Sequence, residues 1–100
     1  MRKTSIVVCK AFINRKRKRV SNTDTDGTVL RLFGRVIAQW EDENTLLVSM
    51  AGWGTHTTRE RLNTLCRLLK LNIYFSQRNH VQYINGIPMG EDQFVKIEVD

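Results

Sequence analysis

Residues 57–71, TTRERLNTLCRLLKL, carry the strongest helical pattern in the chain. Thr57 and Glu60 have the spacing of a capping box, in which a Thr hydroxyl accepts the backbone N–H three residues ahead and the Glu carboxylate reaches back. Four apolar residues then recur at the spacing of one helical face, and these are Leu62, Leu65, Cys66 and Leu69. We therefore expect an amphipathic helix that ends near Leu71.

The segments before this helix are typical of strands. β-Branched and apolar residues dominate Thr4–Ile13, so we expect a first strand that is largely buried on both faces. Three further strands are predicted at Thr28–Phe33, Arg35–Trp40 and Thr45–Met50. Gly34 and the acidic stretch at 41–44 separate these strands, as hairpin turns do.

The segments after the helix also predict strands. A hairpin is predicted from the alternating side chains of Ile73–Gln77 and Val81–Asn85. A turn is expected at Asn85–Pro88, and a last strand is expected at Phe94–Val99. One hundred residues suffice for one hydrophobic core and not for two. Together, these elements predict a single α+β domain, with a mainly antiparallel sheet of about six or seven strands packed against one principal helix at about residues 57–71.

The composition is that of a folded protein with a basic beginning. Hydrophobic residues make up 41% of the chain and charged residues 26%, which argues against disorder. No apolar run approaches the roughly 18 residues of a membrane span, so we expect no membrane partner. Although the net charge is +6, eight of the 16 basic residues precede Val20 and no acidic residue precedes Asp24. The positive charge is therefore regional, and a polyanion is the first partner to consider.

The most concentrated charge is a run of five cations: Arg15, Lys16, Arg17, Lys18 and Arg19. Because these side chains repel one another and must be hydrated, they must occupy a solvated loop or an exposed strand extension, and we expect an exposed basic loop at about residues 14–27. Such a run attracts the phosphates of DNA or RNA, with an affinity that falls steeply as salt rises. The alternative is a loop that only increases solubility.

The predicted helix also carries a polar stripe beside its apolar face. At spacings of four, four and three residues, the stripe consists of Arg59, Asn63, Arg67 and Lys70. Arg binds guanine or phosphate and Asn binds adenine, so Arg59, Asn63 and Arg67 are secondary candidates for nucleic-acid contacts. The alternative is that these residues are the solvent-facing side of an ordinary amphipathic helix.

Most of the eight aromatic residues are expected in the core, and Trp53 and Tyr83 are the candidates for exposed, partner-binding rings. Trp53 lies between Gly52 and Gly54, in an irregular turn just before the helix. Exposed rings stack on unpaired nucleotides or supply the binding energy of a protein interface.

No pattern of residues predicts catalysis or metal binding. The potential zinc ligands Cys9, Cys66, His56 and His80 lack the paired spacings of zinc sites, so we expect neither a metal nor another cofactor. Both thiols are expected to be buried and reduced. The chain also lacks a Walker loop, a Rossmann glycine fingerprint and a nucleophile elbow, and we expect no enzymatic activity.

The stretch AGWGTHTTRERLN at residues 51–63 resembles a motif of small tailed-bacteriophage proteins, of the form A-G-W-x-T-x-T-T-R-E-R-L-N. Four upstream segments are similar to the same group, namely Lys10–Phe12, Asn14–Lys16, Asn22–Thr23 and Gly34–Ala38. The region after Leu71 is outside the resemblance. The resemblance implies a phage-encoded protein in the cytoplasm of an infected bacterium. It implies no mechanism.

Two functions from different classes fit these observations. The first is a small non-enzymatic protein that binds DNA or RNA through the phosphates, with the five-cation run as the main contact. The second is a phage inhibitor or adaptor that binds an acidic surface of a host protein, such as a nucleic-acid enzyme or a defence complex. An unpaired edge strand would also permit a homodimer.

Overall fold

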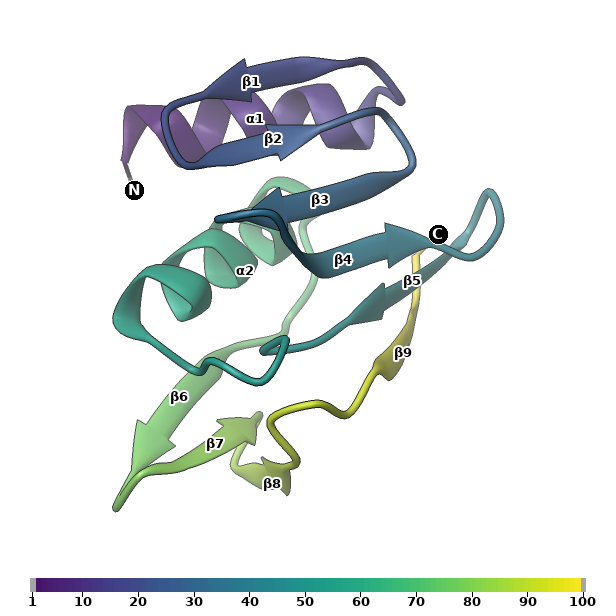
Figure 1. The fold of residues 1–100 in the computed structure, drawn as a ribbon. Helices are drawn as coiled ribbons and strands as arrows, with labels where there is room; N and C mark the ends of the chain where they lie inside the picture. Colours follow the sequence, from purple (N-terminus) through teal and green to yellow (C-terminus); the bar gives the residue numbers. More distant parts are fainter. Residues whose placement is uncertain (1, 100) are drawn as a thin grey trace.

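The computed structural model describes residues 2–99, which form two helices and nine strands (Figure 1). The helices are α1 (Lys3–Ile13) and α2 (His56–Leu68). The strands are β1 (Lys18–Val20), β2 (Thr23–Thr25), β3 (Val29–Leu32), β4 (Arg35–Trp40), β5 (Thr45–Val48), β6 (Phe75–Arg78), β7 (Val81–Ile84), β8 (Ile87–Met89) and β9 (Val95–Glu98). No helix within these residues is long and apolar enough to cross a membrane.

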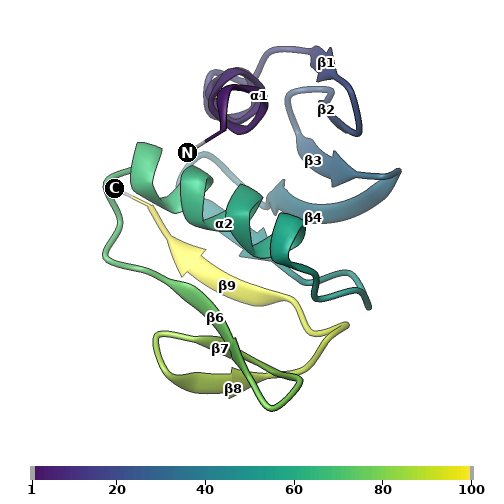
Figure 2. The same cartoon turned by 90° about the vertical axis from the view of Figure 1, so that its left-hand side faces the viewer.

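The strands form two antiparallel sheets. The larger sheet has the order β1-β2-β3-β4-β5-β9, and the smaller one has the order β6-β7-β8. Both helices cover the same face of the larger sheet, and the smaller sheet lies beyond α2 and β9 (Figure 2). The predicted class, a mainly antiparallel α+β fold, is therefore confirmed.

One cluster of buried apolar side chains joins the helices to the larger sheet. Phe12 of α1, Leu65 of α2 and Leu30 of β3 are fully buried in it. Phe12 stacks on Trp40 of β4 with ring centroids 5.3 Å apart, and the Trp40 indole N–H donates to the Phe12 carbonyl at 3.0 Å. Burying a side chain of this size stabilises the fold by about 1.5–3 kcal/mol, so this contact fixes α1 on the sheet.

The N-terminal segment is a helix, and the predicted strand at Thr4–Ile13 is wrong. The buried residues of α1 have the helical spacing i, i+3, i+4, i+7, and they are Ser5, Val8, Cys9 and Phe12. The adjacent β-branched residues Ile6 and Val7 favour a strand only weakly. Packing against α2 and the sheet overrides that preference, and the domain has a second helix that the sequence pattern did not predict.

The region expected as a basic loop at 14–27 contains the short strands β1 and β2, so those residues are not a loop. For Lys18 and Arg19 the structure has the other expected arrangement, an exposed strand extension. Arg15 has a φ of +59° and ends α1, because its N–H and that of Lys16 donate back to carbonyls of the last helical turn. Gly27 lies directly against the Arg15 carbonyl, where a side chain would collide with the backbone. The five consecutive cations therefore continue from the end of α1 into an edge strand.

The remaining elements follow the prediction closely, with two differences. Helix α2 begins at His56 with Thr55 as its cap, whose hydroxyl accepts the Thr58 N–H at 3.2 Å, so the capping box expected at Thr57 is wrong. The stretch Ile87–Met89, expected in a turn region, pairs with β7 as strand β8. Strand β4 has the predicted bounds.

Candidate nucleic-acid interface

Four neighbouring cations lie exposed at the edge of the larger sheet. Lys16 and Arg17 lead into β1, and Lys18 and Arg19 lie on it. Strand β1 is the first strand of its sheet and pairs with β2 alone. Within residues 2–99, none of these four side chains forms an ion pair. We call these residues, 16–19, the basic run.

Arg15, the fifth predicted cation, has a different role. Its guanidinium lies over the Trp40 ring, 3.9 Å from the centroid, and it donates to the carbonyls of Asp42 (3.3 Å) and Glu43 (3.1 Å). Cation–π contacts and bonds to carbonyls hold a guanidinium in place. Arg15 thus joins the end of α1 to the β4–β5 turn, whereas the side chains of the basic run form no ion pair within residues 2–99.

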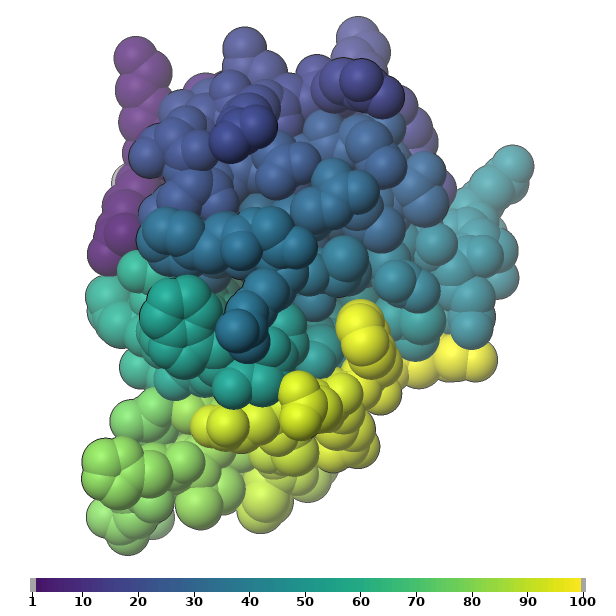
Figure 3. Space-filling view, viewed as in Figure 1, coloured from purple at the N-terminus to yellow at the C-terminus, as the bar shows by residue number. Residues whose placement is uncertain are grey.

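An exposed pair of aromatic rings lies next to the basic run. Phe33, in the β3–β4 turn, and Trp53, before α2, are 57% and 46% exposed, with ring centroids 5.6 Å apart. A hollow of about 570 Å³ lies between Phe33 and Arg19, the last residue of the basic run. It is lined by Arg19, Ser21, Asn22, Asp24, Phe33 and Gly34. The space-filling view shows the face of the molecule formed by β1, β2 and the β3–β4 turn (Figure 3). Trp53 is exposed as the sequence predicts, but its neighbour Phe33 was not singled out from the sequence.

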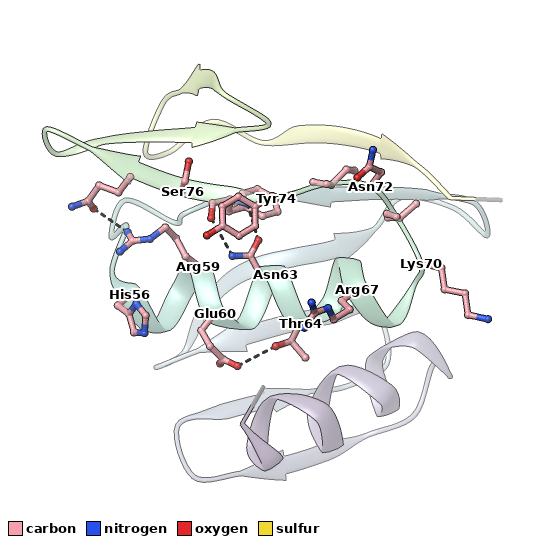
Figure 4. A pocket seen from close by; sticks show the side chains of 14 residues that line it. His56, Arg59, Glu60, Asn63, Thr64, Arg67, Lys70, Asn72, Tyr74 and Ser76 are labelled. Atoms are coloured by element: carbon pink, nitrogen blue, oxygen red, sulfur yellow. Dashed lines mark hydrogen bonds between the residues drawn. The ribbon is translucent and has the colours of Figure 1, made fainter.

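The polar stripe of α2 faces a groove of about 800 Å³ between the helix and residues 71–77 (Figure 4). Arg59 Nη1 donates to Gly54 O, Gln77 Oε1 and Gln82 Oε1 at 2.9–3.1 Å. Asn63 accepts the Phe75 N–H at 2.7 Å and donates to the Phe75 carbonyl at 3.0 Å. Both side chains therefore hold β6 and the turn before α2, while Arg67 and Lys70 are exposed in the groove.

Tyr83 lies apart from Trp53 in the fold. It is half-buried on β7 of the smaller sheet, and it lines a shallow hollow with Ser76, Gln77, Arg78 and Gly86. The neighbours of Trp53, Phe33 and Arg35, belong to the larger sheet. Tyr83 and Trp53 therefore have different neighbours and do not form one continuous aromatic surface.

An ion pair with a buried arginine, which sequence reasoning missed, crosslinks the helices. Arg61 is 3% exposed and donates to Glu60, to Ser5 of α1 (2.6 Å) and to Thr23 of β2 (2.9 Å). Glu60 also accepts from Ser5, from Thr64 and from the Arg2 N–H. Burial raises the pKa of Glu60, but these hydrogen bonds outweigh burial and hold its pKa below the ordinary value. The helical pattern of the sequence shows only that Arg61 precedes the apolar residue Leu62. It cannot reveal that Ser5 of α1 and Thr23 of β2 bind the Arg61 side chain in the interior.

The two cysteines lie in the core. Cys9 and Cys66 are buried free thiols, and burial raises the pKa of each to about 12. A thiol with so high a pKa is a poor nucleophile at neutral pH. Among residues 2–99, no three His, Cys, Asp or Glu side chains gather as a metal site.

Comparison with known proteins gives one match. The family model described as Kyanoviridae Gp96 protein matches residues 1–99. No curated protein and no solved structure matches the chain. Almost the whole fold, including the basic run and the exposed aromatic pair, lies within the matched region.

Proposed function

The chain belongs to the Kyanoviridae Gp96 protein family, and from its surface we propose that this phage protein is a non-enzymatic binder of the phosphate backbone of DNA or RNA. The basic run makes the principal contacts. Arg67 adds a secondary contact from the groove beside α2, whereas Arg59 and Asn63 hold the fold.

The observation that carries this proposal is the absence of internal partners for the basic run within the described part of the chain. Elsewhere in these residues, Arg31 pairs with Asp24 at 2.9 Å and Lys96 pairs with Glu41 at 3.2 Å. Four adjacent cations on one short edge concentrate positive potential, which phosphates neutralise with release of counterions.

The edge position suggests a second role for the same charges. Lysines on an unpaired edge strand prevent it from pairing with another chain. That role requires no anionic ligand, so a binding measurement separates the two explanations.

The test compares two variants with the same net charge. In the first, Lys16, Arg17, Lys18 and Arg19 are replaced by Gln. In the second, four exposed cations elsewhere are replaced by Gln, namely Lys3, Lys10, Lys70 and Arg78. Binding of labelled oligonucleotides is measured over a salt series, after purification with nuclease and high salt.

We expect the plot of log affinity against log salt to become shallower by about 3 in the first variant, since each neutralised phosphate contributes about 0.7–0.9 to the slope. The second variant should keep most of the wild-type slope. Equal slopes in the two variants would contradict the basic run as the contact. Absence of wild-type binding at low salt would contradict the proposed function and favour an acidic host-protein surface instead.

A further inference from the structure

We propose that the ligand is single-stranded nucleic acid, whose unpaired bases stack on the aromatic pair Phe33 and Trp53. This inference rests on the proposed function, and it specifies which form of nucleic acid the surface binds. Four features of the structure support it: the exposure of the two rings, the turn that presents Phe33, the fixed position of Trp53 and the charges around the pair.

The two rings are presented to solvent and are not part of the core. Phe33 is 57% exposed and Trp53 46% exposed, and their planes are tilted by 45°. In contrast, the aromatic pair in the core, Phe12 and Trp40, is stacked and buried. Exposed ring faces on a basic surface are the platforms on which single-strand binders stack bases.

The turn that carries Phe33 does not require an aromatic residue. Phe33 and Gly34 form the two-residue connection between β3 and β4, with φ values of +52° and +78°. Asn and Gly suit such positive angles, whereas a bulky side chain is strained there. Because the ring is also exposed, neither the backbone nor the core explains it. The ring lies against Trp53, with centroids 5.6 Å apart, and a base stacked on this pair would explain an aromatic side chain at this turn.

Trp53 is fixed in position by the segment around it. The backbone N–H of Trp53 donates to the Met50 carbonyl at 2.9 Å. The backbone carbonyl of Trp53 accepts a hydrogen bond from the Thr58 hydroxyl at 3.0 Å. Thr58 lies in the first turn of α2, so the tryptophan is attached to the start of that helix. These bonds fix the backbone of Trp53, and its ring lies 5.6 Å from the Phe33 ring between centroids. A ring attached to a fixed backbone loses less conformational freedom when a base stacks on it.

Cations lie on both sides of the aromatic pair. Arg19 of the basic run lines the same hollow as Phe33. The Arg35 guanidinium lies 5.7 Å from the Trp53 ring centroid and donates to the Ala51 carbonyl at 3.2 Å. The one acid of the hollow, Asp24, is paired with Arg31. A strand whose phosphates follow β1 can thus place its bases on the rings.

This arrangement favours single strands for a structural reason. In a duplex the bases are already stacked and paired, so exposed rings find no free base faces and only the phosphate contacts remain. A single strand makes both kinds of contact. The aromatic pair therefore adds affinity for single strands alone.

The test uses Phe33→Asn and Trp53→Ala, singly and combined. Asn suits the left-handed turn, so Phe33→Asn should fold at least as stably as the wild type. Phe94→Ala is the matched control, because it removes a ring that is 46% exposed, as Trp53 is, and that lines neither the hollow nor the groove. The probes are a labelled single strand, the same strand annealed to its complement, and an abasic strand of equal length.

We expect each ring substitution to weaken single-strand binding on the order of tenfold, with duplex binding, the salt slope and the thermal midpoint nearly unchanged. The wild type should bind the single strand more tightly than the duplex or the abasic strand, and its tryptophan fluorescence should be quenched by the single strand. Phe94→Ala should bind all three probes as the wild type does.

Three results would overturn the inference: ring variants that bind the single strand like the wild type, equal wild-type affinity for abasic and normal strands, or preference for the duplex. Each of these leaves the phosphate-binding function intact if the basic run still controls the salt slope. Absence of binding to every probe would overturn the proposed function itself.

Discussion

Asn63 shows how a polar side chain on a helix surface can serve the fold. The side-chain amide of Asn63 bonds both the N–H and the carbonyl of Phe75, whose side chain is buried. Strand β6 is the first strand of its sheet, so Asn63 takes the place of a neighbouring strand on that side. A backbone group buried without a partner is costly, so this contact is worth more than an exposed hydrogen bond. Asn63 thereby joins the smaller sheet to α2.

For Asn63→Ala we expect a free energy of unfolding lower by about 1–3 kcal/mol, because the Phe75 N–H and carbonyl lose their partners. Chemical denaturation measures this loss, and faster amide exchange of β6 locates it. Nucleic-acid affinity at low temperature should stay near the wild-type value. A stable variant with weakened binding would instead assign Asn63 to the interface.

At the scale of elements, the Glu60–Arg61 ion pair connects α2 to both α1 and β2. Arg61 contacts Ser5 and Thr23, and Glu60 contacts Ser5 as well, so three elements depend on one pair of charges. Removing one partner of a buried ion pair leaves the other charge uncompensated. The packing of α1 on the rest of the domain should therefore depend on pH.

The sign follows from the pKa of Glu60, which is lower in the folded state than the ordinary value of 4.5. The stabilisation is complete above pH about 4.5 and is lost as the pH falls through the lowered, folded-state pKa. Glu60→Gln should be less stable at neutral pH and should lose less stability on acidification. Urea unfolding between neutral and acidic pH measures both effects.

The control for this experiment is Glu91→Gln, which alters an exposed carboxylate. It should reproduce the wild-type pH dependence. If Glu60→Gln also follows the wild-type curve, the acid sensitivity comes from other groups, and the ion pair does not hold the elements together.

For the whole molecule, local patterns predicted the elements that have a clear period and clear ends. Helix α2 has an apolar stripe, and β3, β4 and β5 are bounded by Gly34 and an acidic turn. Helix α1 was missed because Ile6 and Val7 favour strands, and only tertiary packing selects the helix. The burial of Arg61 and the contact between Phe33 and Trp53 both depend on residues that are far apart in the chain. Of the candidate site, the sequence therefore predicted only the basic run and Trp53.

The distribution of charge over the whole molecule leads to a last prediction, on self-association. Replacing the basic run by Gln lowers the net charge from +6 to +2 and also removes the cations from the β1 edge. Unprotected edge strands pair with one another, and like charges oppose this. We expect concentration-dependent association of this variant by sedimentation, together with an unchanged circular dichroism spectrum.

The variant with Gln at Lys3, Lys10, Lys70 and Arg78 has the same net charge of +2 but keeps the charged edge. It should remain in the association state of the wild type if the position of the charges matters. Equal association of the two variants would show that total charge alone keeps the chains apart. The protective role of the cations at the β1 edge would then be excluded, and binding of an anionic partner, with nucleic-acid phosphates first, would explain four neighbouring cations without an ion pair in the described residues.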